Sequence, residues 1–126
     1  MNKSAKDYSE SFKAKRGSAM EAVRQKNYEV GRTLSRQLLT EDPNCKAVLI
    51  VATESLWRLQ RFDEAVTLSK QALAEHPRSE ILSLIFFQVL METGKISEAR
   101  NEMRRLLKLR ESETYRLIMT DYGWTD

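Results

Sequence analysis

Side chains suited to catalysis or metal binding are few in this sequence, and they lie far apart. The chain has one histidine, His76, and one cysteine, Cys45, so no cluster has the spacing of a metal site or of a nucleophile–base pair. No glycine-rich phosphate loop is present. Several carboxylates are expected to lie on solvated helix faces and not to form acid–base pairs; they are Asp63, Glu64, Glu98 and Glu102. We therefore expect a non-enzymatic protein without metal or cofactor, in which Cys45 is an unreactive thiol.

The composition is typical of one soluble domain, which we expect to cover residues 1–126. Hydrophobic residues make up 41% of the chain and charged residues 31%. The net charge of +3 permits acidic partners without requiring nucleic acid. The N-terminus lacks the apolar run of a secretory signal, and the most apolar stretch, residues 81–91, is about half as long as a membrane-spanning helix. We expect a cytoplasmic protein that makes no membrane contact.

A repeat with a period of 34 residues organises the chain. The segment RFDEA at residues 61–65 recurs as KISEA at residues 95–99, and DPN at residues 42–44 recurs as HPR at residues 76–78. This period is the length of a helix-turn-helix repeat unit. The units would cover residues 12–45, 46–79 and 80–113, which leaves residues 114–126 as a terminal helix and tail.

The apolar pattern predicts two helices in each unit. In the middle unit they cover residues 46–59 and 62–75, and Pro77 ends the second. In the third unit they cover residues 80–93 and 96 to about 110, with Gly94 in the turn. The first helix of the chain is expected to begin near Ser4. A terminal helix over residues 114–121 would pack through Leu117 and Ile118, and residues 122–126 would form a tail.

The middle unit resembles a tetratricopeptide repeat. Ala52, Ala65 and Ala72 occupy the small positions where the two helices cross closely, Phe62 occupies the aromatic position at the turn, and Pro77 occupies the terminal proline position. The outer units match less fully. The resemblance implies an all-α fold, a short right-handed α-solenoid of three such units with a C-terminal capping helix.

The same resemblance implies a binding groove, because the first helices of such an array line its concave face. The repeat positions that usually face this groove are occupied here by Arg16, Met20, Ile50, Glu54, Trp57, Arg58, Ile81, Leu84, Gln88 and Met91. Several of these side chains are apolar, and an exposed apolar patch usually marks a binding site.

The helix over residues 80–93 is apolar around nearly its whole circumference, and such a helix is normally buried on all sides. A partner helix in the groove, a second copy of the chain, or the C-terminal tail through Tyr122 and Trp124 could cover it. Irregular packing within the monomer is a further alternative. We expect an external polypeptide, because three units have little internal material to spare.

These observations predict a protein-interaction module that binds an apolar or amphipathic helical segment. Small chains of this architecture resemble the chaperones of bacterial type III secretion, which shield an amphipathic helix of a secreted subunit. One alternative is a structural or scaffold subunit that dimerises through the same patch. The other is a scaffold that binds nucleic acid weakly through a convex basic band, formed by Arg32, Arg36, Lys70, Arg100, Arg104 and Lys108. No aromatic residues alternate with these cations, which argues against specific nucleic-acid binding.

Overall fold

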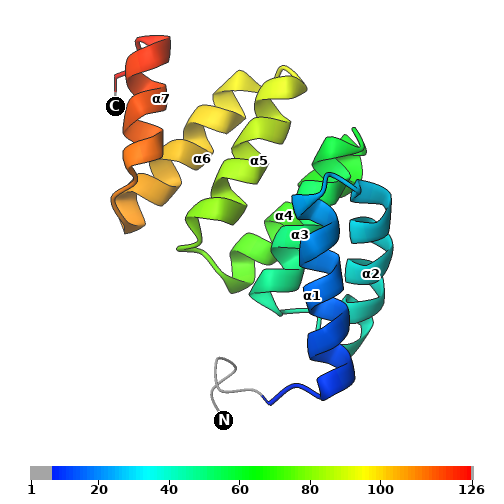
Figure 1. Cartoon of the computed structure of the whole chain (residues 1–126). Helices are drawn as coiled ribbons and strands as arrows, with labels where there is room; N and C mark the ends of the chain where they lie inside the picture. The colour runs from blue at the N-terminus through cyan, green and yellow to red at the C-terminus, as the bar shows by residue number, and fades with distance from the viewer. Residues whose placement is uncertain (1–6, 126) are drawn as a thin grey trace. The chain divides into compact units, whose positions relative to one another are not determined.

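The computed structural model describes residues 7–125, and all the regular structure within them is helical (Figure 1). The order of elements is that of three tetratricopeptide-like helix pairs followed by one more helix, so the all-α prediction is confirmed. The helices are α1 (Glu10–Arg24), α2 (Tyr28–Glu41), α3 (Lys46–Arg58), α4 (Phe62–Glu75), α5 (Glu80–Glu92), α6 (Ile96–Leu109) and α7 (Glu113–Tyr122).

The expected bounds of the last five helices agree with the structure to within one residue at each end. The expected start of the first helix is wrong, because residues 7–9 are not helical and α1 begins at Glu10. The Ser9 hydroxyl accepts a hydrogen bond from the Phe12 amide at 3.1 Å and caps α1 at that point. Ser4 lies outside the described residues.

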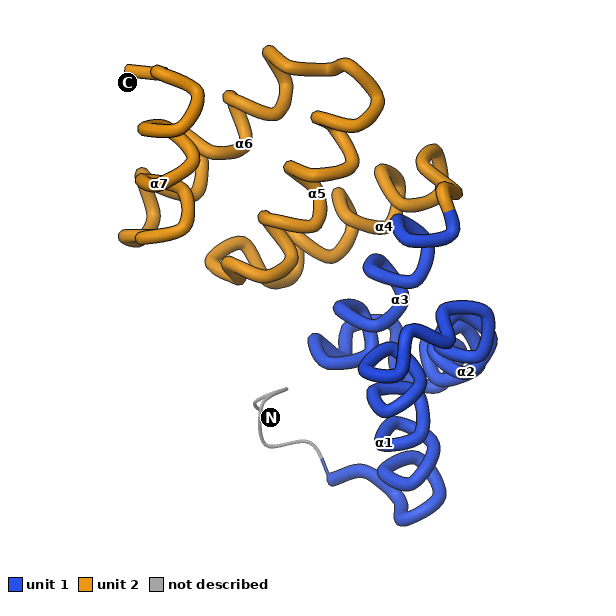
Figure 2. The backbone as a smooth tube through the Cα atoms, turned by 45° about the horizontal axis from the view of Figure 1, so that its top comes forward, with its two compact units in different colours: residues 1–59 blue, residues 60–126 orange. Residues whose placement is uncertain are grey.

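The helices form two compact units, one over residues 1–59 with α1–α3 and one over residues 60–126 with α4–α7 (Figure 2). We refer to them as unit 1 and unit 2. The boundary between them falls inside the middle 34-residue repeat, after its first helix. The prediction of one domain over residues 1–126 stays a prediction.

The turns inside the three repeats share one unusual backbone conformation. Lys26, Gln60 and Gly94 are spaced by 34 residues, and their φ angles are 63°, 60° and 78°. A positive φ is easy for glycine and costs about 1 kcal/mol or more for other residues. A residue in the left-handed conformation therefore follows the first helix of each repeat, at the same repeat position in all three.

In unit 1, α1, α2 and α3 all contact one another. The backbones approach closely at Gly31 of α2, where an added Cβ atom would lie 2.7 Å from Ser55 Oγ of α3 and 3.0 Å from Val23 Cγ2 of α1. Tyr8 precedes α1, stacks on Phe12, and donates a hydrogen bond to Asp42 at 2.5 Å. These contacts fix both ends of the three-helix packing in unit 1.

In unit 2, α5 packs against both α4 and α6. The helix α7 does not pack as expected, because Leu117 is 58% exposed and Ile118 is only half-buried. The buried residues of α7 are Tyr115 and Met119, which lie one helical turn apart on the opposite face.

The Ser112 hydroxyl caps α7 by accepting a hydrogen bond from the Tyr115 amide, and the Tyr115 ring packs edge-on against Phe87 of α5.

The segment after α7 folds back onto unit 2 and is not an open tail. The Trp124 amide donates a hydrogen bond to the Met119 carbonyl at 2.8 Å. The Trp124 indole meets the Phe87 ring edge-on, with 6.2 Å between centroids, and the Arg100 guanidinium lies 4.9 Å from the indole centroid. The C-terminal segment thus covers part of the apolar surface of α5, as one of the four alternatives predicts.

Candidate protein-interaction surface

The helix α5 is mostly buried but leaves one stripe accessible. Ile81 is 53% exposed, and Leu84, Gln88 and Met91 are half-buried. Their spacing of three, four and three residues places them on one face of the helix. We call these four residues the α5 stripe; the rest of α5 is buried from Leu82 to Leu90.

The chain itself therefore covers most of α5. The helices α4 and α6 pack against it, and Tyr115 and Trp124 cover Phe87. The expectation that the chain has little internal material to spare for this helix is wrong, because α7 and the C-terminal segment supply side chains that the repeat pattern does not include. The part of α5 that remains accessible is the α5 stripe.

On α1, the predicted groove residues Arg16 and Met20 lie one helical turn apart. The Arg16 guanidinium lies 5.3 Å from the centroid of the Tyr8 ring and 5.9 Å from that of Phe12, so it takes part in the packing of the chain's start. Met20 is 49% exposed. The accessible apolar group on α1 is therefore Met20.

On α3, the predicted groove residues form a local polar–aromatic group. The Arg58 guanidinium lies 3.9 Å from the centroid of the Trp57 ring, and its Nε lies 3.8 Å from the Glu54 carboxylate. Ile50, one turn before Glu54, is half-buried. The helices α1 and α3 contact each other within unit 1. The assignment of the predicted residues of units 1 and 2 to one groove stays a prediction.

The histidine and the cysteine singled out for chemistry belong to different units. Cys45 is buried at the start of α3, and His76 follows the last residue of α4. Among residues 7–125 no group of three histidine, cysteine or acidic residues could hold a metal ion. Over the same range, no helix combines the length and apolar character that a bilayer span requires.

Three of the four singled-out carboxylates are exposed, but the expectation for Glu102 is wrong. Glu102 is 6% exposed and accepts hydrogen bonds from Ser83 Oγ at 2.6 Å and from Arg105 Nη2 at 2.7 Å. Ser83 Oγ lies 2.7 Å from the Tyr115 hydroxyl, and because Ser83 donates its one hydroxyl hydrogen to Glu102, the Tyr115 hydroxyl donates to Ser83. Burial raises the pKa of Tyr115. This network joins α5, α6 and α7.

The repeat register contains a signal for the burial of Glu102. Leu34 and Leu68 stand at the equivalent positions of the first two repeats, and both are at least half-buried. The charge of Glu102 suggests that its side chain lies in solvent, but its repeat position suggests that it lies in the interior. The side chain is buried, as the repeat position suggests, because Arg105 and Ser83 supply hydrogen bonds that compensate the buried carboxylate.

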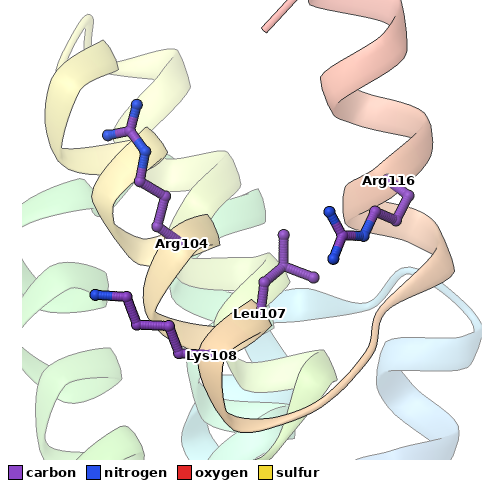
Figure 3. A pocket seen from close by; sticks show the side chains of 4 residues that line it. All are labelled: Arg104, Leu107, Lys108 and Arg116. Atoms are coloured by element: carbon purple, nitrogen blue, oxygen red, sulfur yellow. The ribbon is translucent and has the colours of Figure 1, made fainter. Parts of the chain in front are cut away.

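Part of the predicted basic band lines a surface hollow in unit 2. Arg104, Leu107 and Lys108 of α6 and Arg116 of α7 line a cavity of about 330 Å³ (Figure 3). Arg116 is outside the predicted band because it lies on the terminal helix, beyond the repeat register. Arg100 has a different environment, since its guanidinium lies over Trp124. The predicted band is therefore not one uniform face within unit 2.

The helix order, the repeated left-handed turns and the buried small residues define a helical-repeat protein. The sequence model of the tetratricopeptide repeat family matches residues 56–120, which is just over half of the chain. The chain belongs to the tetratricopeptide repeat family. No curated protein matches it in sequence. Proteins of this fold are generally interaction modules and not enzymes.

Solved structures of other helical-repeat proteins share the fold. A mutant of MamA is 21% identical, with a TM-score of 0.74, and the match covers 85% of this chain and 78% of MamA. The type III secretion translocator chaperone SycD of Yersinia enterocolitica, in an alternative dimer, is 12% identical with a TM-score of 0.79, and the match covers 92% and 89% of the two chains. A structure of MamA AMB-1 gives 21% identity and a TM-score of 0.71 over 85% of this chain and 60% of that one.

Proposed function

We propose that the protein is a non-enzymatic tetratricopeptide module that binds an apolar or amphipathic helical segment of another protein. The observation that carries this proposal is the α5 stripe, where Ile81 is exposed and Leu84 and Met91 are half-buried on a helix whose remaining apolar residues are buried. Within unit 1, the most accessible apolar side chain among the predicted groove residues is Met20.

The chemistry of the α5 stripe suits a helical ligand. From Ile81 to Met91 the stripe follows the helix for about 15 Å, which matches about three turns of a partner helix. A ligand with apolar residues at every third and fourth position could pack on Ile81, Leu84 and Met91. Met91 is flexible enough to adapt to different side chains, and Gln88 offers a polar contact in the middle.

A chaperone role is the more specific form of this proposal. The fold is shared with SycD, which is a translocator chaperone, and at 12% identity the likeness concerns the fold. In this role the protein would shield an amphipathic helix of its partner, in the cytoplasm where we expect the chain to be.

The test compares two exposed isoleucines of unit 2. Ile81→Glu alters the α5 stripe, and Ile96→Glu is the matched control because Ile96 is 40% exposed at the start of α6. The probe is a fluorescent amphipathic peptide with leucines at helical spacing, titrated by anisotropy. Loss of one buried isoleucine contact should weaken binding by about tenfold or more in Ile81→Glu, with little change in Ile96→Glu.

Thermal melting of both variants shows whether either substitution disturbs the fold. Equal loss of binding in both variants would contradict the proposal, and so would a wild-type chain that does not bind the peptide. Leu84→Glu and Trp57→Glu extend the test to half-buried residues. If these two variants melt at much lower temperature than the wild type, their side chains belong to the core and not to a groove.

A further inference from the structure

We propose that the hollow between α6 and α7, a surface separate from the α5 stripe, binds an acidic peptide segment in which an apolar residue is flanked by acidic ones. We call it the α6–α7 hollow and define it by its lining residues, Arg104, Leu107, Lys108 and Arg116. The proposal depends on the chemistry of these four side chains and on how they are arranged.

The arrangement places an apolar side chain between cationic ones. Figure 3 shows Leu107 of α6 and Arg116 of α7 extending toward each other, while Arg104 and Lys108 extend from α6 on the other side of Leu107. The cavity of about 330 Å³ is large enough for a few side chains of a ligand. A ligand with one apolar residue over Leu107 would therefore bring its neighbouring residues close to cations on both sides.

A carboxylate of the chain itself pairs with Arg116, one of the lining cations. Glu111, in the loop before α7, lies with its Oε1 atom 2.9 Å from Arg116 Nε. This pairing, with a backbone hydrogen bond from Ser112, holds the pKa of Glu111 below its usual value. Glu111 is exposed, so solvent weakens the pair and an incoming carboxylate can share or replace it. Guanidinium groups bind carboxylates with two parallel hydrogen bonds, which favours acidic peptides as ligands.

The lining favours a peptide over nucleic acid. Single-stranded nucleic acid is held by aromatic side chains on which bases stack, and the four lining residues include no aromatic ring. Leu107 would offer nothing to a phosphate backbone, whereas it can contact an apolar side chain. Nucleic acid is therefore the competing outcome of the test.

The test uses the full chain and a fluorescent peptide with one leucine between pairs of glutamates. A second peptide has glutamine in place of glutamate, a third has glycine in place of leucine, and a short single-stranded DNA is the competing ligand. We expect the wild-type chain to bind the first peptide, and the other two peptides to bind about tenfold more weakly. Anisotropy is measured at low and at moderate salt.

Three variants test the site by effects of opposite sign. Lys108→Glu should weaken binding of the acidic peptide by about tenfold. Lys70→Glu is the matched control, because Lys70 is an exposed lysine of α4 in the same unit and does not line the hollow. Glu111→Gln should tighten binding by about threefold, because it removes the carboxylate that competes for Arg116.

Equal weakening by Lys108→Glu and Lys70→Glu would overturn the proposal, since binding would then reflect overall charge. Tighter binding of the DNA, lost in Lys108→Glu, would assign the hollow to nucleic acid instead. Failure of the wild-type chain to bind the acidic peptide at concentrations on the order of 1 mM would also overturn it. Ile81→Glu should leave this binding unchanged, so the outcome is independent of the α5 stripe.

Discussion

Gly31 shows how one residue sets the helix packing in unit 1. Glycine inside a helix costs about 1 kcal/mol relative to alanine, so a compensating contact is expected where it occurs. Here the backbone of α2 approaches α1 and α3 so closely that a Cβ atom at Gly31 would lie 2.7 Å from Ser55 Oγ. Gly17 of α1 has no atom within 4 Å of the equivalent Cβ position, so two helical glycines of unit 1 differ in the space around them.

Gly31→Leu should destabilise the protein, and Gly17→Leu should not. The leucine at position 31 must displace side chains of α1 and α3, at a cost of about 1–3 kcal/mol in the free energy of unfolding. At position 17 the side chain is free to extend into solvent, and the higher helix propensity of leucine should stabilise α1 slightly. Urea denaturation of both variants measures the difference. Equal stability of the two variants would show that α1–α3 can separate without loss, contrary to the close packing.

At the scale of elements, a buried polar network attaches α7 to the helices before it. Glu102 of α6 accepts hydrogen bonds from Ser83 of α5 and from Arg105, and Ser83 contacts the Tyr115 hydroxyl of α7. Glu80 at the start of α5 also accepts a hydrogen bond from the Ser112 hydroxyl, which caps α7. Such a network fixes the orientation of α7 because each buried polar group depends on its partners.

Glu102→Ala should therefore destabilise unit 2. The change leaves Ser83 with one fewer partner and removes the carboxylate that pairs with Arg105, whose side chain is about one-third exposed. A fully buried pair would cost about 3–5 kcal/mol, and the partial exposure of Arg105 lowers our expectation to about 2 kcal/mol. Glu98→Ala, an exposed glutamate of the same helix, should change the free energy of unfolding by less than about 0.5 kcal/mol.

Hydrogen exchange of the α7 amides adds a local measurement to chemical denaturation. Faster exchange in α7 of Glu102→Ala, with no change in α7 of Glu98→Ala, is the expected pattern. If the two variants are equally stable and α7 exchanges at the same rate in both, the network does not hold α7.

The bounds of α3–α7 could be predicted from the sequence, but the packing of α7, which lies outside the repeat register, could not. The turns, Pro77 and the apolar spacing locate α3–α6 almost to the residue, because local signals repeat there. The orientation of α7 depends on contacts that no spacing reveals, since Leu117 and Met119 are equally apolar candidates for the interior. In the structure the Tyr115 hydroxyl forms a hydrogen bond with Ser83, and this contact places the face of α7 with Tyr115 and Met119 in the interior.

The two candidate surfaces follow the same rule. The α5 stripe could be predicted because Ile81, Leu84, Gln88 and Met91 occupy defined repeat positions on a first helix. The α6–α7 hollow could be predicted only in part, because Arg116, which pairs with Glu111, joins Arg104 and Lys108 through the packing of the terminal helix. Charge pattern alone identifies the basic residues and says nothing about which of them share a cavity.

At the scale of the whole molecule, the chain has two candidate surfaces of different chemistry. The chain belongs to the tetratricopeptide repeat family, and its net charge is +3. Three of the four residues of the α5 stripe are apolar, whereas the α6–α7 hollow combines three cations with one leucine. Surfaces of such different chemistry are suited to different segments of a partner. The salt dependence of binding would distinguish the two surfaces, because binding to the hollow should weaken as the salt concentration rises and binding to the α5 stripe should not.

The whole chain should be a monomer in the absence of a partner. A stable dimer interface buries about 1,200–2,000 Å² in total, and four residues of one helix, three of them already half-buried, supply only a small part of that area. Size-exclusion chromatography with light scattering, over a wide range of protein concentrations, should give the mass of one chain throughout. A mass that doubles with concentration in the wild type and in Ile96→Glu, but not in Ile81→Glu, would show that the α5 stripe binds a second copy. The homodimerising scaffold would then replace the helix-binding module as the function of this surface.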